Sequence, residues 1–218
     1  MVRLGVGFLA ALLVSSSAMA ADVTMPVRDW TGPYVGIQAG YGWGKSDWSF
    51  LDGGTATKHD IDGFVGGAHL GYDFQHDSIV MGLVGDVNFG DVNGSSTCPN
   101  EDYTCKTSVD FLSTIRARIG VTPADGLLIY ATGGLAIGDV HSKAPSASNT
   151  YKGSQTSLGW TIGGGAEYMI TDNVSVGAQL LYVDLGNKKS DLKFDGSNDP
   201  FKDKLDMVVA QGTLSFRF

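Results

Sequence analysis

The feature that most constrains this chain is a repeated alternation of apolar and polar residues. In the final stretch, residues 210–218, even positions are apolar or small and odd positions are mostly polar, and the chain ends on Phe218, two residues after Phe216. A period of two indicates a strand with one face against an apolar medium. An alternating strand that ends on paired aromatics is typical of a transmembrane β-barrel.

The N-terminus indicates export. Arg3 precedes a run of small and apolar residues from Leu4 to Val14, which is followed by serines and by Ala18-Met19-Ala20. This order is typical of a secretory signal, with cleavage predicted after Ala20. The apolar run is too short for a spanning helix, and no later segment approaches the ~18 apolar residues that such a helix needs.

The predicted domain organisation is therefore a signal peptide over residues 1–20, a periplasmic lead over 21–29 and one β-barrel over 30–218. The chain has 31 glycines and only 17% charged residues, which favours a glycine-rich all-β protein. Its formal net charge of −8 argues against a nucleic-acid partner.

Short and long connections alternate between eight alternating segments after Trp30. Outer-membrane barrels have short periplasmic turns and longer extracellular loops, and an even strand number leaves both termini in the periplasm. We therefore predict an eight-stranded antiparallel up-and-down transmembrane β-barrel with four long extracellular loops. The short connections are 75–78, 122–126 and 171–173, and the long ones are about 45–60, 90–107, 139–154 and 187–204.

Alternation also predicts which side chains face the lumen. Asp86, Arg116, Arg118 and Glu167 have inward parity, as do Asp73, His69 and Asp110. Eight strands enclose a space that side chains just fill, and a charge removed from water needs a partner. We predict a buried salt-bridge network of the first four residues, with a proton or ion path as the alternative. The register of the strand over 127–138 stays open, because both of its faces are apolar.

Aromatic residues concentrate at strand ends, where amphipathic rings favour the membrane interfaces. The inward charges favour this transmembrane reading over a soluble barrel with an apolar cavity. One girdle is predicted from Tyr41, Trp43, Phe89, Phe111, Trp160 and Tyr182, and the other from Tyr72, Phe74, Tyr130, Tyr168, Phe216 and Phe218.

Four segments, 30–44, 112–120, 182–186 and 216–218, resemble the porin-family outer-membrane β-barrel proteins of α-proteobacteria, which are relatives of the OmpA-type barrel. The resemblance implies an eight-stranded barrel in the outer membrane, in contact with its lipid. It also implies that Phe216 and Phe218 form part of the signal read by the barrel-assembly machinery, and that host surface molecules are candidate partners.

The fourth long connection interleaves lysines with aspartates, and such a segment is most often simply solvated. Its functional interpretation is contact with lipopolysaccharide phosphates through the lysines, which are Lys188, Lys189, Lys193, Lys202 and Lys204.

Two lumenal positions depart from the family pattern. Gln179 stands where the resemblance leads us to expect a glutamate, and Gln211 where we expect an arginine. Loss of one anion together with one cation leaves the internal charge balance intact, so we interpret the pair as a neutral exchange. This interpretation requires the two side chains to lie close together.

Cys98 and Cys105 are the two cysteines of the chain and fall in the second long connection. Because an exported protein passes through an oxidising compartment, we predict a disulfide between them. A metal site is not expected, since two cysteines without neighbouring histidines do not make a ligand set. We expect no cofactor.

The histidines give no clear catalytic site. His59 and His141 fall in long connections, His69 in the lumen and His76 in a short turn, so none faces lipid, where a lipid hydrolase would need a His-activated Ser. A site at the extracellular end that uses His59 with Asp60, or His141, stays open as an alternative. The predicted function is a structural, surface-exposed barrel with a plugged lumen that contributes to envelope integrity and host contact, and not an enzyme. A narrow porin for small solutes is the alternative, followed by a lipid-modifying enzyme.

Overall fold

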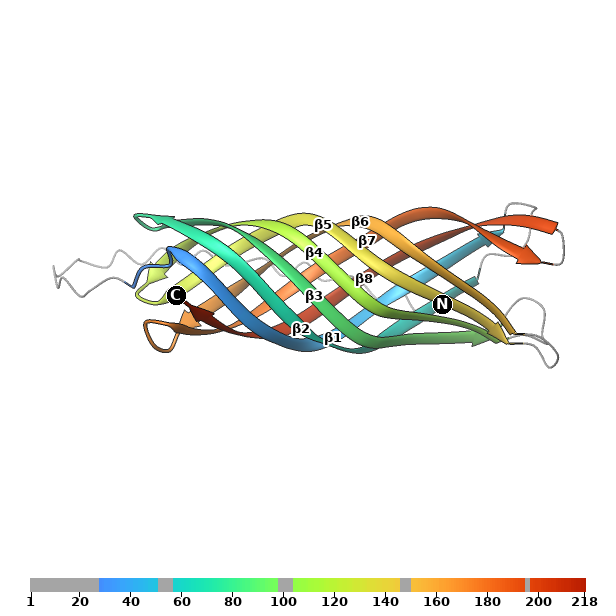
Figure 1. Ribbon diagram of the computed structural model, residues 1–218, viewed down its shortest axis with the longest axis horizontal. Helices are drawn as coiled ribbons and strands as arrows, with labels where there is room; N and C mark the ends of the chain where they lie inside the picture. Colours follow the sequence, from blue (N-terminus) through green and yellow to red (C-terminus); the bar gives the residue numbers. More distant parts are fainter. Residues whose placement is uncertain (1–27, 51–56, 98–103, 146–149, 195–196) are drawn as a thin grey trace, which may run out of the picture.

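Eight antiparallel strands form one closed barrel in the computed structural model, which describes residues 28–50, 57–97, 104–145, 150–194 and 197–218 (Figure 1). Each strand pairs with its sequence neighbours, and β1 also pairs with β8. No helix long and apolar enough to cross a membrane occurs among the described residues. The strands are β1 (Gly32–Phe50), β2 (Thr57–His76), β3 (Ile79–Thr97), β4 (Thr104–Ala124), β5 (Leu127–Pro145), β6 (Thr150–Met169), β7 (Val174–Phe194) and β8 (Ser197–Arg217).

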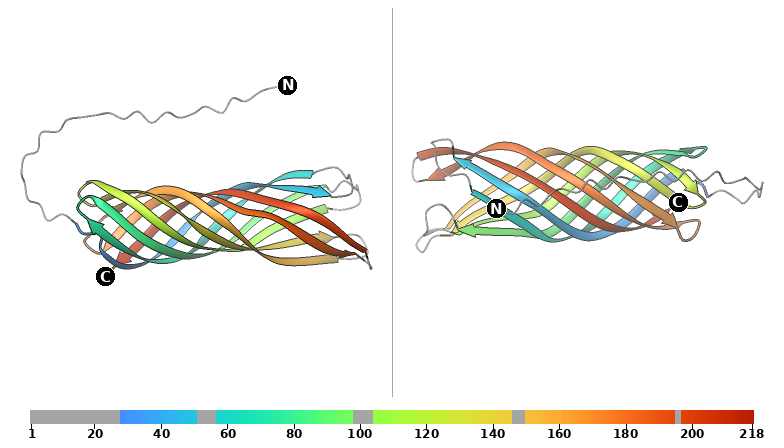
Figure 2. Two further views of the ribbon diagram at one scale, coloured as in Figure 1. Left: turned by 90° about the horizontal axis from the view of Figure 1, so that it is seen from above. Right: turned by 180° about the vertical axis from the view of Figure 1, so that it is seen from behind.

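Closure depends on the first and last strands, which pair from Tyr34 opposite Arg217 to Phe50 opposite Phe201. A closed sheet satisfies every backbone group within the barrel and leaves no free edge. Figure 2 shows from two further sides that the strands wrap obliquely around one long axis. The predicted fold class, an eight-stranded antiparallel up-and-down barrel, is confirmed.

The two ends of the barrel differ. The end that holds the short connections and Phe218 is called the turn end here, and the opposite end is the loop end (Figure 1). Each strand has 19 to 21 residues, whereas a tilted strand needs only about 9–11 to cross a bilayer. The strands therefore continue well beyond the thickness of a membrane.

This continuation changes the prediction for the long connections. Residues 45–60 were expected to form a loop, but β1 runs to Phe50 and β2 begins at Thr57. The same holds at the other three long connections. Backbone pairing does not depend on apolar alternation, so a strand can continue where the alternation of the sequence ends. Sequence alternation therefore marks the membrane-facing part of each strand and not its full length.

Lysine and arginine are segregated along the barrel. Arg116, Arg118 and Arg217 are buried in the turn half of the lumen. By contrast, every lysine of the chain lies on the loop-end part of a strand, at positions 45, 58, 106, 143, 152, 188, 189, 193, 202 and 204.

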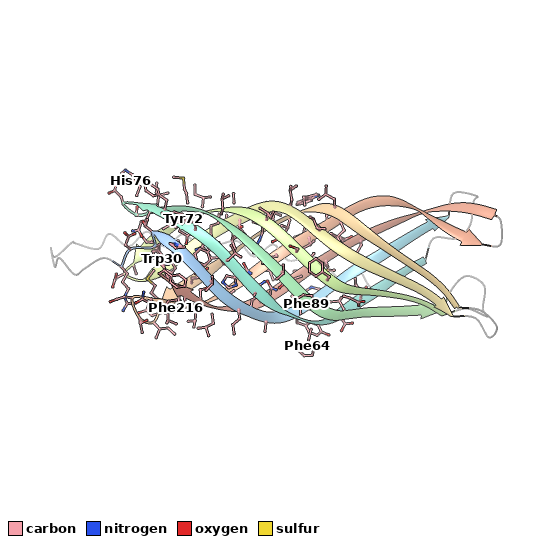
Figure 3. The ribbon with its side chains drawn as sticks, viewed as in Figure 1. Trp30, Phe64, Tyr72, His76, Phe89 and Phe216 are labelled. Atoms are coloured by element: carbon pink, nitrogen blue, oxygen red, sulfur yellow. The ribbon has the colours of Figure 1, made fainter. Side chains whose placement is uncertain are left out.

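A belt of exposed apolar side chains surrounds the turn half of the barrel, and its aromatic members lie at two levels. Figure 3 shows Tyr72 and Phe216 near the turn end and Phe64 and Phe89 toward the middle of the barrel. Ring pairs connect neighbouring strands at the middle level, with centroid distances of 5.1 Å for Tyr41–Phe64, 5.5 Å for Phe89–Phe111 and 5.5 Å for Trp160–Tyr182. This is the arrangement of an interfacial girdle.

Two predicted positions are wrong. Tyr130 was assigned to the turn-end girdle, but it is buried in the lumen, because the register of β5 sends Leu128, Tyr130 and Thr132 inward. Room for its ring comes from Gly165, where a Cβ would lie only 2.8 Å from the Tyr130 hydroxyl. Asp110 was predicted to be lumenal but is exposed, since the pairing of β4 with β5 has a bulge there.

The lumen is filled in layers. Near the turn end, a cluster of Trp30, Val80, Leu128, Tyr130 and Met169 is buried, and we call it the turn-end cluster. Polar and charged side chains occupy the next level. Beyond them lies an apolar layer, which was not predicted because the lumenal face of an outer-membrane barrel is expected to be polar. The members of this apolar layer are Ile61, Val65, Val92, Leu112, Ala136, Leu181, Val183, Leu185, Leu205, Met207 and Val209.

Candidate functional site: the lumenal charge network

Four charged side chains meet in the lumen next to the turn-end cluster, and we call them the Asp73 group. They are Asp73 of β2, Arg118 of β4, Glu167 of β6 and Arg217 of β8. The Arg118 guanidinium donates to Asp73 through Nε at 2.7 Å and through a terminal nitrogen, and it donates to Glu167 at 2.7 Å. Arg217 donates to Asp73 at 2.8 Å. One carboxylate therefore serves two arginines.

Aromatic rings frame both guanidinium groups. The Arg118 guanidinium carbon lies 4.7 Å from the Tyr34 ring centroid and 5.2 Å from that of Tyr130. That of Arg217 lies 4.8 Å from Tyr34 and 5.1 Å from Trp30. These distances are within the range of cation–π attraction, which is stronger away from water. The rings therefore pack against both guanidinium groups inside the lumen.

A second group lies on the side of the apolar layer, and we call it the Asp86 group. Asp86 of β3 pairs with Arg116 of β4 at 2.7 Å and accepts hydrogen bonds from Thr114 and Asn88. Arg116 Nε donates to the Thr114 hydroxyl at 2.9 Å. The sequence places these residues together because they have inward parity on adjacent strands, with Asp86 directly opposite Thr114.

The side-chain amides of Gln179, Gln211 and Asn88 link Arg116 back to Asp86, so the hydrogen bonds of the Asp86 group form a closed circuit. Gln179 accepts from Arg116 at 3.2 Å and donates to Gln211 at 3.0 Å. Gln211 donates to Asn88 at 2.9 Å, and Asn88 donates to Asp86 at 2.6 Å. The two glutamines that depart from the family pattern are thus direct partners, which meets the requirement of the neutral-exchange interpretation.

Formal charges balance within the two groups. Asp73, Asp86 and Glu167 oppose Arg116, Arg118 and Arg217, and all six are buried. Buried ions need partners and additional hydrogen bonds to offset the cost of leaving water. Since all six charges are paired, neither group offers a free charge to a passing ion.

The residues predicted for the network are located as follows. Asp86 pairs with Arg116, and Glu167 pairs with Arg118. Two members, Asp73 and Arg217, were not among the residues predicted for the network. Asp73 had been assigned inward by its parity, and Arg217 occupies an odd, lumen-facing position of the final strand, so parity was the signal that could have found both.

The other predicted site residues lie apart from the network. Phe216 and Phe218 are exposed on the outer surface, with ring centroids 5.1 Å apart. Cys98 is outside the described residues, and Cys105 lies in β4 opposite Ser96, so the disulfide stays a prediction.

Among the side chains that the structure describes, one His–Ser contact occurs, and its surroundings do not resemble a catalytic site. His69 Nε2 lies 2.9 Å from Ser215 Oγ, and both residues are buried in the lumen. His69 Nδ1 has no hydrogen-bond partner, so the third group that orients a catalytic base is missing. In the described part of the chain, no three His, Cys, Asp or Glu side chains form a metal-binding cluster.

A closed barrel with an apolar outer belt, aromatic girdles and a filled polar lumen defines a transmembrane β-barrel protein. Residues 6–215 match the model of the family described as the outer membrane protein beta-barrel domain. The chain belongs to this family, and it is therefore an outer-membrane protein.

Relatives that cover most of the chain are outer-membrane proteins of α-proteobacteria. The chain is 34% identical to the 31 kDa outer-membrane immunogenic protein of Brucella melitensis, with 95% of this chain and 96% of the relative covered. It is 30% identical to the 25 kDa outer-membrane immunogenic protein of Brucella abortus, with 96% and 95% covered. A 22 kDa outer membrane protein of Rhizobium leguminosarum is 32% identical, with 77% and 70% covered.

Among solved structures, the outer membrane protein OprG of Pseudomonas aeruginosa has a similar fold. It aligns with a TM-score of 0.56 and 15% identity, covering 87% of this chain and 97% of that one. At this level of identity the likeness concerns the barrel fold alone.

Proposed function

We propose that this protein is a structural barrel of the outer membrane that contributes to envelope integrity, and that its lumen is closed to solutes. The observation that carries the proposal is the layered filling of the lumen. The charge network lies between the turn-end cluster and the apolar layer, and its six ions are all paired. Eight-stranded barrels have interiors just wide enough for side chains to fill.

The same proposal places both termini in the periplasm and the loop end at the cell surface. Support comes from the alternation of short turns at the turn end with longer strand extensions at the loop end, which is the pattern of outer-membrane barrels. The two Brucella relatives are named as immunogenic proteins. We infer that the loop-end strands meet lipopolysaccharide and host surface molecules, while the turn end faces the periplasm.

Single-channel conductance in planar bilayers tests the closed lumen. We expect no discrete conductance from the refolded wild-type protein or from Arg116→Ala, because the apolar layer and the Asp73 group remain when Arg116 is removed. Conductance in the wild type that changes in Arg116→Ala would show that the lumen is a selective pathway, and the narrow-porin alternative would replace the proposal.

The conductance experiment needs two controls. Lys45→Ala removes a cation at an exposed position outside the lumen. It changes the net charge as Arg116→Ala does, but it leaves the lumen unchanged. An open porin of about 16 strands, refolded under the same conditions, shows that the bilayer assay detects a real pore. A shift in electrophoretic mobility on boiling confirms that each inserted variant is folded.

The proposal also excludes catalysis. His69 and Ser215 are buried behind lumenal side chains, so a lipid substrate has no access to them. A lipid A release assay with purified protein tests this point, with Ser215→Ala as the matched variant. Release by the wild type that is lost in Ser215→Ala would favour the lipid-modifying alternative.

A further inference from the structure

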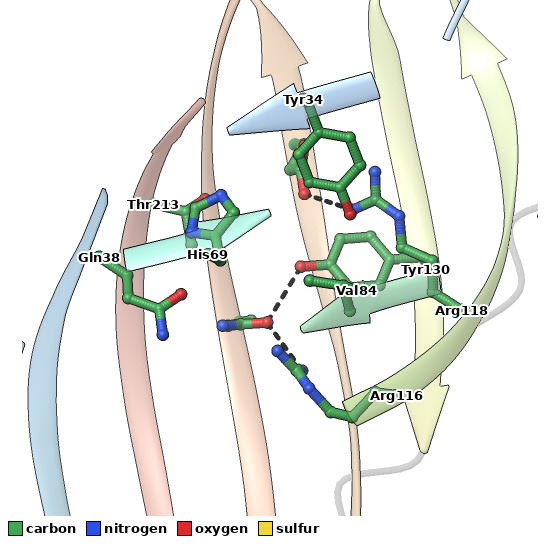
Figure 4. Close-up of a pocket in the computed structure, with 10 residues that line it drawn as sticks. Tyr34, Gln38, His69, Val84, Arg116, Arg118, Tyr130 and Thr213 are labelled. Carbon is green, nitrogen blue, oxygen red and sulfur yellow. Dashed lines mark hydrogen bonds and ion pairs between the residues drawn. The ribbon is translucent and has the colours of Figure 1, made fainter. Parts of the chain in front are cut away.

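A small cavity lies in the lumen between the Asp73 group and the Asp86 group. Its volume is about 10 Å³, and residues of both groups line it together with Tyr34, Gln38, His69 and Thr213 (Figure 4). A space of roughly this size accommodates one water molecule when polar partners surround it.

Unpaired polar atoms gather at this cavity. Within the part of the chain that the structure describes, six buried side-chain atoms have no hydrogen-bond partner, and four of them belong to residues lining the cavity. They are the Tyr34 hydroxyl, Gln38 Oε1, His69 Nδ1 and Thr213 Oγ1. Because buried polar atoms are nearly always paired with protein or ordered water, we propose that this cavity binds one ordered water molecule.

The chemistry of the four atoms selects water over an ion. Gln38 Oε1 can only accept a hydrogen bond, so an anion would leave it unsatisfied. Arg116 and Arg118 line the same cavity and repel a cation, and the lining carboxylate of Glu167 is already paired with Arg118. Water is neutral, donates to the amide oxygen, and accepts from or donates to the two hydroxyls and the imidazole nitrogen.

Glycines leave room for two of these groups, and a hydrogen bond orients a third. A Cβ at Gly36 would lie 2.5 Å from the His69 ring, and one at Gly71 would lie 2.3 Å from the Tyr34 hydroxyl. Gln38 is fixed from its other side, where Nε2 donates to Asn88 at 2.6 Å. The polar atoms are therefore oriented before water binds, which lowers the cost of ordering it.

The proposed water should exchange slowly. The turn-end cluster lies on one side of the polar level and the apolar layer on the other, so exchange requires a fluctuation of the packed lumen. This lifetime rests on the closed lumen of the proposed function, whereas the existence of the site does not.

Two measurements test the site. In a high-resolution crystal structure of the wild type, we expect one density peak within hydrogen-bond distance of at least three of the four atoms. Oxygen-17 relaxation dispersion of water, which counts water molecules and not exchangeable protons, should show at least one long-lived water in the wild type. The double variant His69→Phe/Thr213→Val removes two partners, and its dispersion amplitude should fall by that of one water.

Thr161→Val is the matched control, because Thr161 is a buried lumenal threonine outside this cavity whose hydroxyl already donates to the Tyr182 carbonyl. It should keep the wild-type amplitude. If the double variant does not fold, Thr213→Val alone is compared with this control. An empty cavity in the crystal structure would overturn the site. A density peak together with rapid exchange would retain the site and overturn the closed lumen.

Discussion

Among single residues, Asp73 is the lumenal side chain whose removal should cost the most stability. It is fully buried and accepts hydrogen bonds from both Arg118 and Arg217. Asp73→Ala leaves two buried guanidinium groups short of a partner, so we expect a loss of about 3–5 kcal/mol in the free energy of unfolding. Urea titration of the protein refolded in lipid vesicles measures this loss.

Asp172→Ala is the control for that prediction. Its carboxylate lies 3.7 Å from Arg28 in an exposed turn, with a side-chain exposure of 91%. An exposed ion pair contributes about 0–1 kcal/mol. Equal losses in the two variants would contradict the importance assigned to the Asp73 group.

The glutamine pair gives a second prediction. Gln179→Glu and Gln211→Arg each introduce an unbalanced charge into a buried, balanced network, so each alone should destabilise the barrel. Together they restore one anion and one cation to hydrogen-bonded positions. A double-mutant cycle in urea should therefore give a favourable coupling energy of about 0.5–3 kcal/mol. Purely additive losses would contradict the neutral-exchange interpretation.

Substitution of Phe218 should affect assembly of the barrel in cells much more than the stability of the folded barrel. Its side chain is 69% exposed and contacts Phe216 on the outer surface, so it contributes little to the packed lumen. Following the proposed role in recognition by the barrel-assembly machinery, Phe218→Ala should reduce the amount of folded protein in the outer membrane of cells several-fold. The same variant should lose less than about 1 kcal/mol in vitro. Cell fractionation and urea titration give the two values, with Phe74→Ala, another exposed aromatic near the turn end, as control.

At the scale of elements, the β2–β3 hairpin contains a strained residue. Asp77 has a φ of 52°, and it is the only non-glycine residue with a positive φ in the described ranges. Asp77→Gly removes the steric cost of the left-handed conformation and should raise the free energy of unfolding by up to about 1 kcal/mol. Ser78→Gly, at the adjacent turn position with negative φ, should lower it slightly. Urea titration distinguishes the two signs.

The orientation of a strand can be predicted from the sequence only where its two faces differ in polarity. In β4, the alternation of Ile115 and Ile119 with Arg116 and Arg118 fixes both faces, since lipid and lumen differ sharply in polarity there. In β5 both faces are apolar, so the sequence does not show that Tyr130 points inward. Its place depends on neighbouring strands, namely on the space above Gly165.

At the scale of the whole molecule, strand number, order and pairing follow from the sequence, but strand length and the filling of the lumen do not. The alternation of apolar and polar residues depends on contact with lipid, so it does not predict the strand extensions at the loop end. The partners of each lumenal charge depend on side chains that meet across the barrel, as when Asp73 of β2 reaches Arg217 of β8. The alternation of the sequence predicts which charges face the lumen. Which of these charges form ion pairs depends on how the barrel closes.

Because the lysines lie toward one end of the barrel, amine labelling can report which end of the barrel faces the outside of the cell. Every lysine residue belongs to the loop-end part of a strand, whereas the arginines of the lumen are buried near the turn end. A membrane-impermeant amine-reactive dye added to intact cells should therefore label these lysines if the loop end faces outward, and it should label almost nothing if the barrel is inverted. Mass spectrometry of the labelled peptides would thus determine the orientation of the protein without any antibody, tag or engineered cysteine.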